Sequence, residues 1–463
     1  MLIYNYYQTH ITMKNFTYTT KILLLILFLI SNNITQAQQK LFQDVTILDG
    51  TGKPAKEHQD ILVSNDKIIA ITATAAKTPK GVTIINLKGK TVMPLIIDTH
   101  AHLGLLKDTI MASENFTKEN IAKHLLRFQD YGIGSLLSMG TDHKEIFPLR
   151  DESRSGKLTG ATIYTAGIGF GVKDGAPPIS FGMDKVNRPQ TPEEARQQVK
   201  ELAVFKPDVI KIWVDDFFGK FPKMKPEIYK AIIDEAYKNN IRVSTHLYYL
   251  EDAHQLVSSG VDIIAHSIRD QEVDDALLLA MKKNKVTYIP TLSLDEFAYI
   301  YEGNPEWTSD PFFKASLDPL VFEMINSPAY KAKVKKNPST PKEKLALQTA
   351  LINVKKIFDA GIPITLGTDA GAQPIRAMGF SEHMEMELMV KAGIPVLETI
   401  KIATENGAIL LKSEKENGTL QVGKKANFIV LDKNPADDIT NTRTIKEVWK
   451  NGVKVNNGPI KTN

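Results

Sequence analysis

Eight short apolar runs alternate with amphipathic stretches through the middle of the chain, and this alternation is the feature that most constrains the fold. The runs are LIIDTHAH, GIGSLLSMG, ATIYTAG, DVIKIWVDD, IRVSTH, VDIIAH, VTYIPT and ITLGTD. Stretches with helical spacing of apolar residues, such as IYKAIIDEAYKNN, separate them. Strands that alternate with helices form parallel sheets, so the pattern predicts an α/β fold, a (β/α)8 or TIM barrel over residues 93–414.

The phase of each run determines which side chains point into the predicted barrel. Side chains alternate between the two faces of a strand, so Ile210 and Ile212 face the helices while Lys211 faces the lumen. The same alternation points five more polar side chains inward at the carboxyl ends of runs: His100, His102, His246, His266 and Asp369. Barrel active sites lie at those ends. We therefore expect these groups to meet at the barrel mouth.

Histidine is concentrated at the predicted strand ends, where four of the ten histidines occur. His100 and His102 lie on one face of a strand, about 6.5–7 Å apart, so both imidazoles can converge on one metal ion. The alternative interpretation is two polar residues at a strand end. We favour solvated or capping roles for His143 and His383, which follow the second and eighth runs, the alternative being that each reaches the site.

The absence of cysteine and the distribution of charge exclude several kinds of site. The absence of cysteine excludes disulfides, thiolate metal ligands and a cysteine nucleophile. Any metal site must therefore use histidine, carboxylates or something rarer. The net charge is +4 with Lys and Arg scattered along the chain, so we expect no nucleic-acid partner.

The two ends of the chain share a texture of short β-like runs. Residues 41–92 contain VTILDG and VTIINLKGKTV, and residues 415–459 contain GTLQVGKKANFIVLDKNP. Matching β-rich segments on both sides of a long central region predict one small β-sandwich built from both chain ends.

Residues 1–37 are predicted to be a secretory signal peptide. Lys14 and Lys21 supply positive charge, residues 22–30 are an unbroken apolar core, and Ala37 is a small residue suited to cleavage. Translation from Met13 is an alternative start. We expect a periplasmic or secreted protein with no stable membrane insertion after cleavage, the alternative being a retained anchor.

The motifs PLIIDTHAH, GTDAG and GTLQVGKKANFIVLD, with the strand-end His246 and His266, resemble the amidohydrolase superfamily over nearly the whole chain after the signal. Lys211 in DVIKIWVDD resembles the binuclear branch that is prolidase-like or imidazolonepropionase-related and uses a carboxylated lysine. Leu95 departs from the pattern, because the family usually has glycine after Pro94. This changes a turn residue and no ligand.

The resemblance implies two divalent ions, with zinc expected and manganese or cobalt also compatible. His100 and His102 would hold one ion, His246 and His266 the other, and carboxylated Lys211 would bridge them. Asp369 would bind the first ion and a bridging hydroxide. The alternative for Lys211 is an ordinary lysine that pairs with Asp215 or Asp216.

The implied mechanism gives Asp369 the proton of the attacking hydroxide, which it returns to the leaving amine. Tyr248, just beyond His246, would donate a hydrogen bond to the developing oxyanion, the alternative being an aromatic in the wall or lid. Arg269 and Arg376 are candidates for binding a substrate carboxylate, although Arg269 has acidic neighbours with which it could pair locally, Asp270 and Glu272.

The segment 294–344, after the seventh run, is long and rich in aromatic residues, which is typical of a lid insertion. We expect an exported metal-dependent amidohydrolase that cleaves C–N amide bonds of a small-molecule or peptide substrate, with dipeptides or N-acyl amino acids favoured. A cyclic-amide hydrolase or a deaminase on the same scaffold is the enzymatic alternative, and a catalytically silent binding module the non-enzymatic one. The pattern leaves a homo-oligomer open.

Overall fold

The computed structural model describes residues 39–74 and 80–460. The predicted signal peptide, with cleavage after Ala37, therefore lies outside the described residues. Within the described ranges, no helix has both the length and the hydrophobicity needed to cross a membrane.

Seven of the eight predicted runs are strands, and they form two parallel sheets. One sheet has the order β10-β9-β6 and the other the order β11-β12-β13-β14. The strands are β6 (Ile96–Ala101), β9 (Ile133–Ser138), β10 (Thr162–Thr165), β11 (Ile210–Trp213), β12 (Val243–His246), β13 (Ile263–Ala265) and β14 (Thr287–Ile289). Helices alternate with them: α2 (Lys118–Asp130), α3 (Ile146–Arg154), α4 (Pro192–Ala203), α5 (Pro226–Lys238), α6 (Leu250–Ser258) and α7 (Asp275–Lys283). The predicted α/β alternation is thus observed.

The eighth run, residues 364–369, lies between β14 and β6 and hydrogen-bonds to both, but it pairs only through isolated bridges. The backbones approach closely here, because a Cβ added to Gly367 would lie 2.7 Å from Cβ of His100. Another isolated bridge joins Phe170, after β10, to Ile212 of β11. The continuous ladder of a closed barrel, which the sequence analysis predicted, is therefore not formed. Single bridges stand at these junctions because the segments there are too irregular for strand pairing.

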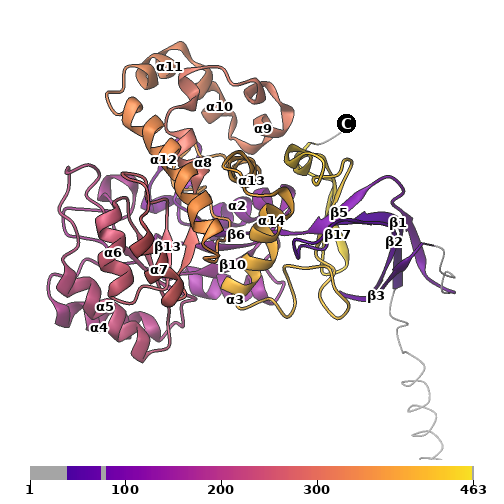
Figure 1. The fold of residues 1–463 in the computed structure, drawn as a ribbon, viewed down its shortest axis with the longest axis horizontal. Coiled ribbons are helices and arrows are strands. Elements are labelled where there is room, and N and C mark those ends of the chain that lie inside the picture. The colour runs from indigo at the N-terminus through magenta and orange to yellow at the C-terminus, as the bar shows by residue number, and fades with distance from the viewer. Residues whose placement is uncertain (1–38, 75–79, 461–463) are drawn as a thin grey trace, which may run out of the picture.

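Both ends of the chain contribute strands to one eight-stranded sheet, on the right of Figure 1. Its order is β17-β16-β15-β5-β1-β2-β3, with β4 also paired to β1. The sequence predicted a sandwich, but β5 pairs with both β1 and β15 and so joins the two halves in a single hydrogen-bonded sheet. The strands are β1 (Gln39–Ile47), β2 (Lys56–Ser64), β3 (Lys67–Ala73), β4 (Thr83–Asn86), β5 (Thr91–Pro94), β15 (Phe428–Leu431), β16 (Ile445–Lys450) and β17 (Val453–Asn456).

An aromatic cluster connects the two halves of this sheet. Phe42 of β1 meets Phe428 of β15 edge to face, with ring centroids 4.9 Å apart, and Trp449 of β16 at 4.7 Å. Such pairs contribute about 0.5–1.5 kcal/mol beyond the burial of their area. The cluster therefore ties the first strand of the sheet to strands that are nearly 400 residues away in sequence.

The predicted lid segment forms a helical insertion that rises from the strands in Figure 1. Its elements are α8 (Leu292–Phe297), α9 (Pro311–Ser316), α10 (Pro319–Asn326), α11 (Pro328–Lys335) and α12 (Thr340–Asp359). Most of its aromatic side chains pack among themselves and against Phe380 of α13 (Phe380–Lys391): the Trp307 and Phe313 rings are 4.7 Å apart, and the Phe313 and Phe380 rings 4.8 Å. These aromatics anchor the insertion to the main body.

The remaining elements complete the chain around the strands. A short hairpin follows β6, and three helices and a π-helical turn follow the eighth run. They are β7 (Leu106–Lys107), β8 (Ile110–Met111), α13 (Phe380–Lys391), α14 (Val396–Lys401), η5 (Ile402–Asn406) and α15 (Gly407–Leu410).

Leu95, the position that departs from the family pattern, is buried between β5 and β6. A Cβ added to Gly134 of β9 would lie 2.7 Å from Cβ of Leu95. The leucine side chain therefore occupies space that Gly134 leaves open, and the change at residue 95 is absorbed by packing.

Candidate active site

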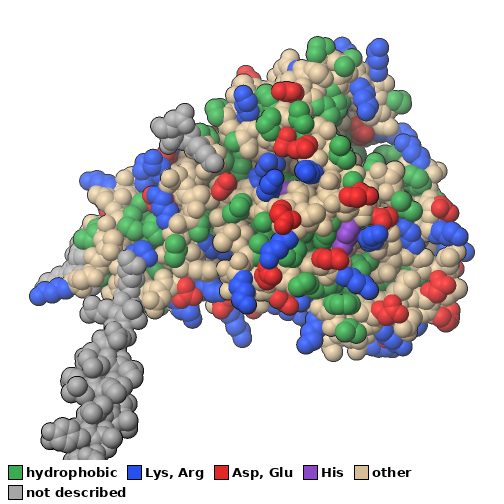
Figure 2. Space-filling view, turned by 180° about the vertical axis from the view of Figure 1, so that it is seen from behind, with side chains coloured by type: hydrophobic (Ala, Val, Ile, Leu, Met, Phe, Trp, Pro, Cys, Tyr) green, Lys and Arg blue, Asp and Glu red, His purple; other side chains and the backbone are tan. Residues whose placement is uncertain are grey.

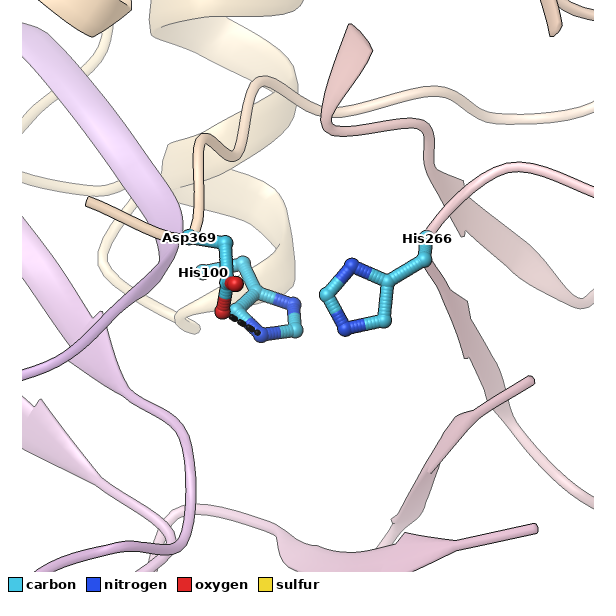
Figure 3. A group of neighbouring side chains, drawn as sticks. All are labelled: His100, His266 and Asp369. Atoms are coloured by element: carbon cyan, nitrogen blue, oxygen red, sulfur yellow. Dashed lines mark ion pairs between the residues drawn. The ribbon is translucent and has the colours of Figure 1, made fainter. Parts of the chain in front are cut away.

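Six polar side chains that the sequence analysis singled out converge at the carboxyl ends of the parallel strands. They come from five different segments, around β6, β11, β12, β13 and the eighth run: His100, His102, Lys211, His246, His266 and Asp369. All but Lys211 line a pocket of about 370 Å³. Figure 3 shows the side chains of His100, His266 and Asp369 pointing toward one another.

The distances among these groups suit a metal centre. One ligand atom each of His100, His266 and Asp369 lie within 4.8 Å of one another. Oδ1 of Asp369 is 3.3 Å from Nε2 of His100 and 2.8 Å from Nε2 of His102. The ring of His266 is 4.5 Å from that of His100 and 4.3 Å from that of His246, measured between centroids. Imidazole and carboxylate are ligands that zinc and similar ions prefer.

Unpartnered buried atoms support the same conclusion. Nδ1 of His100 and Nζ of Lys211 are buried without a hydrogen-bond partner among the described residues. Buried polar groups are rarely left unsatisfied, and an unsatisfied one calls for an explanation such as an ion. The residues present therefore fit a divalent metal site.

Electrostatics hold these groups in states that bind cations. Burial lowers the pKa values of His100, His246 and His266, so their imidazoles are neutral near pH 7. Burial alone would raise the pKa of Asp369, but the charges of Arg376 and His102 outweigh burial and hold that pKa well below the usual range. Neutral imidazoles beside an ionised carboxylate are the protonation states that a metal requires.

Lys211 on β11 is fully buried. Burial lowers the pKa of its amine to about 7, against the opposing attraction of Asp369. The alternative pairing with Asp215 or Asp216 is not formed, because Asp215 binds His246 and Asp216 binds Tyr249. The amine is thus partly neutral at neutral pH, as carbamate formation requires.

A second layer of groups orients the histidines, and the sequence analysis missed it. Nδ1 of His102 lies 2.7 Å from Oγ1 of Thr141, and Nδ1 of His266 lies 2.9 Å from Oγ1 of Thr291. Such bonds fix the orientation and tautomer of ligand imidazoles. Thr141 and Thr291 each follow a strand-like run, but neither residue type nor spacing marks it as a partner.

The backbone at two of the site residues is strained. His266 and Asp369 have φ values of 73° and 59°, in the left-handed region that residues other than glycine seldom adopt. Such conformations cost about 1–3 kcal/mol each and concentrate at functional sites.

Arg376, a predicted carboxylate-binding residue, lines the pocket and forms an ion pair with Asp369. Arg269 also lines the pocket and is buried; its Nε lies 3.0 Å from Oδ1 of Asp295, at the start of the insertion. Local pairing of Arg269 with Asp270 or Glu272 is not formed. Asp295, which burial gives a pKa of about 6, was not predicted, because nothing in the sequence joins it to Arg269.

Tyr248 is half-buried and lines the pocket. The guanidinium of Arg269 lies 4.6 Å from its ring centroid, and Phe218 packs edge-on at 4.9 Å. Burial raises the pKa of its hydroxyl, so the group is a hydrogen-bond donor at neutral pH. Both predicted roles, oxyanion donor and wall aromatic, are compatible with this position.

Two further histidines lie outside the pocket. Nε2 of His143 is 3.2 Å from Oγ of Ser113, compatible with the capping role assigned to it. His383 is fully buried and hydrogen-bonds to Thr442 and to the carbonyl of Tyr131. His383 is therefore not solvated, because α13 is buried on the face that carries it. Its bond to the carbonyl of Tyr131, the C-cap residue of α2, fits the predicted capping role.

The family model of the amidohydrolase family matches residues 91–455, which include every residue of this site. The chain therefore belongs to the amidohydrolase family, as the motifs indicated. Among curated relatives, ochratoxinase from Aspergillus niger is 26% identical over 349 residues, covering 71% of this chain and 60% of that protein. The chain thus matches about three fifths of the length of ochratoxinase. A 5-methylthioadenosine/S-adenosylhomocysteine deaminase from Halalkalibacterium halodurans is 22% identical, covering 85% of this chain and 84% of the deaminase.

Solved structures share the fold. A Xaa-Pro dipeptidase with bound methionine in its active site superposes with a TM-score of 0.72 and 23% identity, covering 90% of this chain and 99% of that one. The A. niger ochratoxinase structure gives 0.68 and 20%, covering 92% and 96%. The architecture is therefore that of amidohydrolase structures of the TIM-barrel type.

Proposed function

We propose that this chain is a metal-dependent hydrolase of C–N amide bonds, acting on dipeptides or N-acyl amino acids. The observation that carries the proposal is the buried cluster of His100, His266 and Asp369 beside the unpartnered amine of Lys211. Family membership supports the reaction class, and the name of one structural relative, a Xaa-Pro dipeptidase, supports dipeptides as substrates.

Two divalent ions, zinc first among the candidates, would be held by His100 and His102, by His246 and His266, and by Asp369. Bound there, they would supply water activation and carbonyl polarisation near neutral pH. Lys211 would join them as a carbamate, for which its pKa of about 7 leaves enough neutral amine.

The chain's own groups would do the rest of the chemistry. Asp369 would accept the proton of the attacking water and deliver it to the leaving amine, since its carboxylate stands at the centre of the cluster. Tyr248 would donate a hydrogen bond to the oxyanion, and Arg269 or Arg376 would bind a substrate carboxylate at the pocket wall. The pair between Arg376 and Asp369 would loosen when Asp369 takes a metal.

The domain organisation and the export of the protein are also proposals. We propose that residues 93–414 form the hydrolase domain, in which the eighth run takes the place of the last strand between β14 and β6. Residues 41–92 and 415–459 would form a composite domain. Export to the periplasm or the exterior is proposed from the signal-like order of residues 13–37. N-terminal sequencing of the mature protein should begin at Gln38, and a retained apolar segment would replace export with anchoring.

A deaminase or cyclic-amide hydrolase is the second candidate, because a deaminase is among the relatives and covers most of the chain. Purified protein reconstituted with zinc, manganese or cobalt should be tested against dipeptides, N-acyl amino acids, cyclic amides and adenosine derivatives. Release of amino acid from the first two classes supports the proposal. Turnover of only the last two would overturn it, and no turnover of any class would favour a binding module.

A further inference from the structure

A second cavity, of about 590 Å³, lies at the other end of the parallel strands. Its wall includes Leu95, before β6, Ser135 near the start of β9, and Thr162 at the start of β10. The opposite wall comes from the end sheet and the loop before it, including Lys425 and Lys450. The candidate active site occupies the carboxyl ends of the same strands, so the two cavities are separate.

Three cations line this cavity against one acidic residue, Glu416. The charge of Arg154 is compensated by Asp208, because Nη2 of Arg154 donates to both carboxylate oxygens of Asp208, each at 2.8 Å. Lys425 pairs with Glu416 at 2.7 Å.

Lys450 has no such compensation. Its ammonium donates to two neutral acceptors, the carbonyl of Gly160 and Oγ1 of Thr162, and no carboxylate pairs with it in the described part of the chain. Burial lowers the pKa of Lys450 to about 8, and the charge of Lys425 adds to the effect. A cation withdrawn from water without a counter-ion is costly, and a bound anion would relieve that cost.

Two neutral side chains on the same wall point to a ligand independently. Gln129 and Ser135 are 5% and 7% exposed. Both side chains line the cavity, and neither makes a hydrogen bond with the residues that the structure describes. Their amide and hydroxyl groups are therefore free to donate to something inside the cavity.

We propose that this cavity binds a small organic anion, a carboxylate or a phosphate ester, with Lys450 as its charge partner and Gln129 and Ser135 as hydrogen-bond donors. The volume falls in the range of small-molecule sites, about 300–1,000 Å³, and exceeds what a bare inorganic ion needs. The site is separate from the proposed hydrolytic centre, so it does not depend on the proposed function.

The test is calorimetric titration of the purified full-length protein with succinate, glycerol 3-phosphate and glycerol. One of the two anions should bind and glycerol should not; which one binds distinguishes a carboxylate from a phosphate ester. Lys450→Gln should weaken the binding at least about tenfold, because a charge-assisted bond is lost. Lys454→Gln, which removes an equal charge from an exposed lysine on the next strand, should leave it unchanged.

An anion could also bind in the candidate active site, and Arg269→Ala tests for that. If the anion binds in the second cavity, the Arg269→Ala protein should bind it as tightly as the wild type does. Because Lys450 also ties β16 to β10, Gln129→Glu is a second variant that retains the lysine. It places a carboxylate in the cavity, so anion affinity should fall by a similar factor. Failure of both anions to bind, or wild-type affinity in folded Lys450→Gln or in Gln129→Glu, would overturn the proposal.

Discussion

The carboxylate of Asp369 contacts three other side chains of the candidate site, those of His100, His102 and Arg376. Burial raises its pKa, but the charges of Arg376 and His102 and the bonds of the two histidines outweigh burial and hold the pKa well below the usual range, so the carboxylate is ionised near pH 7. In the proposed mechanism this one carboxylate is both a metal ligand and the proton acceptor, so activity should be most sensitive to changes there.

Asp369→Asn should lower kcat at least about a hundredfold, because an amide can neither accept the water proton nor deliver it to the leaving amine. Steady-state kinetics with the best substrate of the screen would measure this. Asp432→Asn, which alters an exposed aspartate paired with Lys90, should keep wild-type kinetics. Near-wild-type turnover by folded Asp369→Asn would show that the proton transfer is assigned to the wrong residue.

Lys211→Ala should lose most activity and bind fewer than two metal ions per chain, since the bridging carbamate would be gone while His100, His102 and Asp369 could still hold one ion. Metal content by mass spectrometry and activity would be measured together. Adding acetate or propionate should partly restore both, because the small acid can occupy the vacated space. Full activity with one ion and an unmodified lysine would favour the mononuclear alternative.

Arg269 and Arg376 should act on substrates that carry a free carboxylate. Arg269→Ala or Arg376→Ala is expected to raise KM for N-acyl amino acids by about tenfold or more, and to change KM for the corresponding amides far less. Comparing each acid with its amide provides the matched control. An equal effect on acid and amide would mark the arginine as structural. For Arg269 the structural role would be its ion pair with Asp295.

At the scale of elements, the helical insertion is held to the body by one buried carboxyl group, that of Glu385, as well as by aromatic packing. Oε1 and Oε2 of Glu385 on α13 accept the backbone N–H groups of Leu292 (2.8 Å) and Ser293 (2.7 Å), where α8 begins. Glu385 therefore couples α13 to the segment that supplies Asp295 to the pocket.

Burial raises the pKa of Glu385 from 4.5 to about 8. The folded protein therefore binds this proton more tightly than the unfolded chain, and the group's contribution to the free energy of unfolding is full below pH 4.5 and declines as pH rises toward 8. The decline is at most about 1.4 kcal/mol per pH unit. Glu385→Gln should flatten this part of the pH dependence.

Urea unfolding at pH 5, 6, 7 and 8 would measure that slope. Glu323→Gln, at an exposed position of α10, should keep the slope of the wild type. If Glu385→Gln also kept it, the carboxyl of Glu385 would not be the group that titrates in this window.

On the scale of the whole molecule, the charged surface offers no concentrated basic region on the face shown in Figure 2, where acidic, basic and hydrophobic side chains are mixed. The charged groups that distinguish the molecule lie in two cavities at opposite ends of one set of strands. Histidines and carboxylates line one cavity, and lysines line the other.

Removal of metal should lower both activity and the melting temperature, since the proposed ligands come from separate strands that the ions would join. A ligand present at one hundred times its Kd stabilises the folded state by about 2.7 kcal/mol. Thermal unfolding before and after chelation, and after adding zinc back, would measure this. The Asp369→Asn variant should show a smaller change on chelation. A melting temperature and activity unaffected by chelation would contradict the metal site.

The sequence by itself determined which side chains could meet. Alternation along a strand is a local property of the backbone, so His100, Lys211 and His246 could be assigned to the inner face without knowledge of the neighbouring strands. Family motifs then identified the superfamily, since they preserve the residues around the site. The insertion could be located for a similar reason, because its length and composition differ from the surrounding repeats.

Only the tertiary structure decided the pairing between distant residues. Arg269 meets Asp295, His246 meets Asp215, and Lys450 comes to lie across from Gln129 because separate elements pack together, and no local pattern encodes such packing. The irregular pairing of the eighth run and the single sheet formed by the chain ends also depend on how distant segments pack together. Strand pairing depends on the register and closeness of neighbouring segments, which the alternation of a run does not specify.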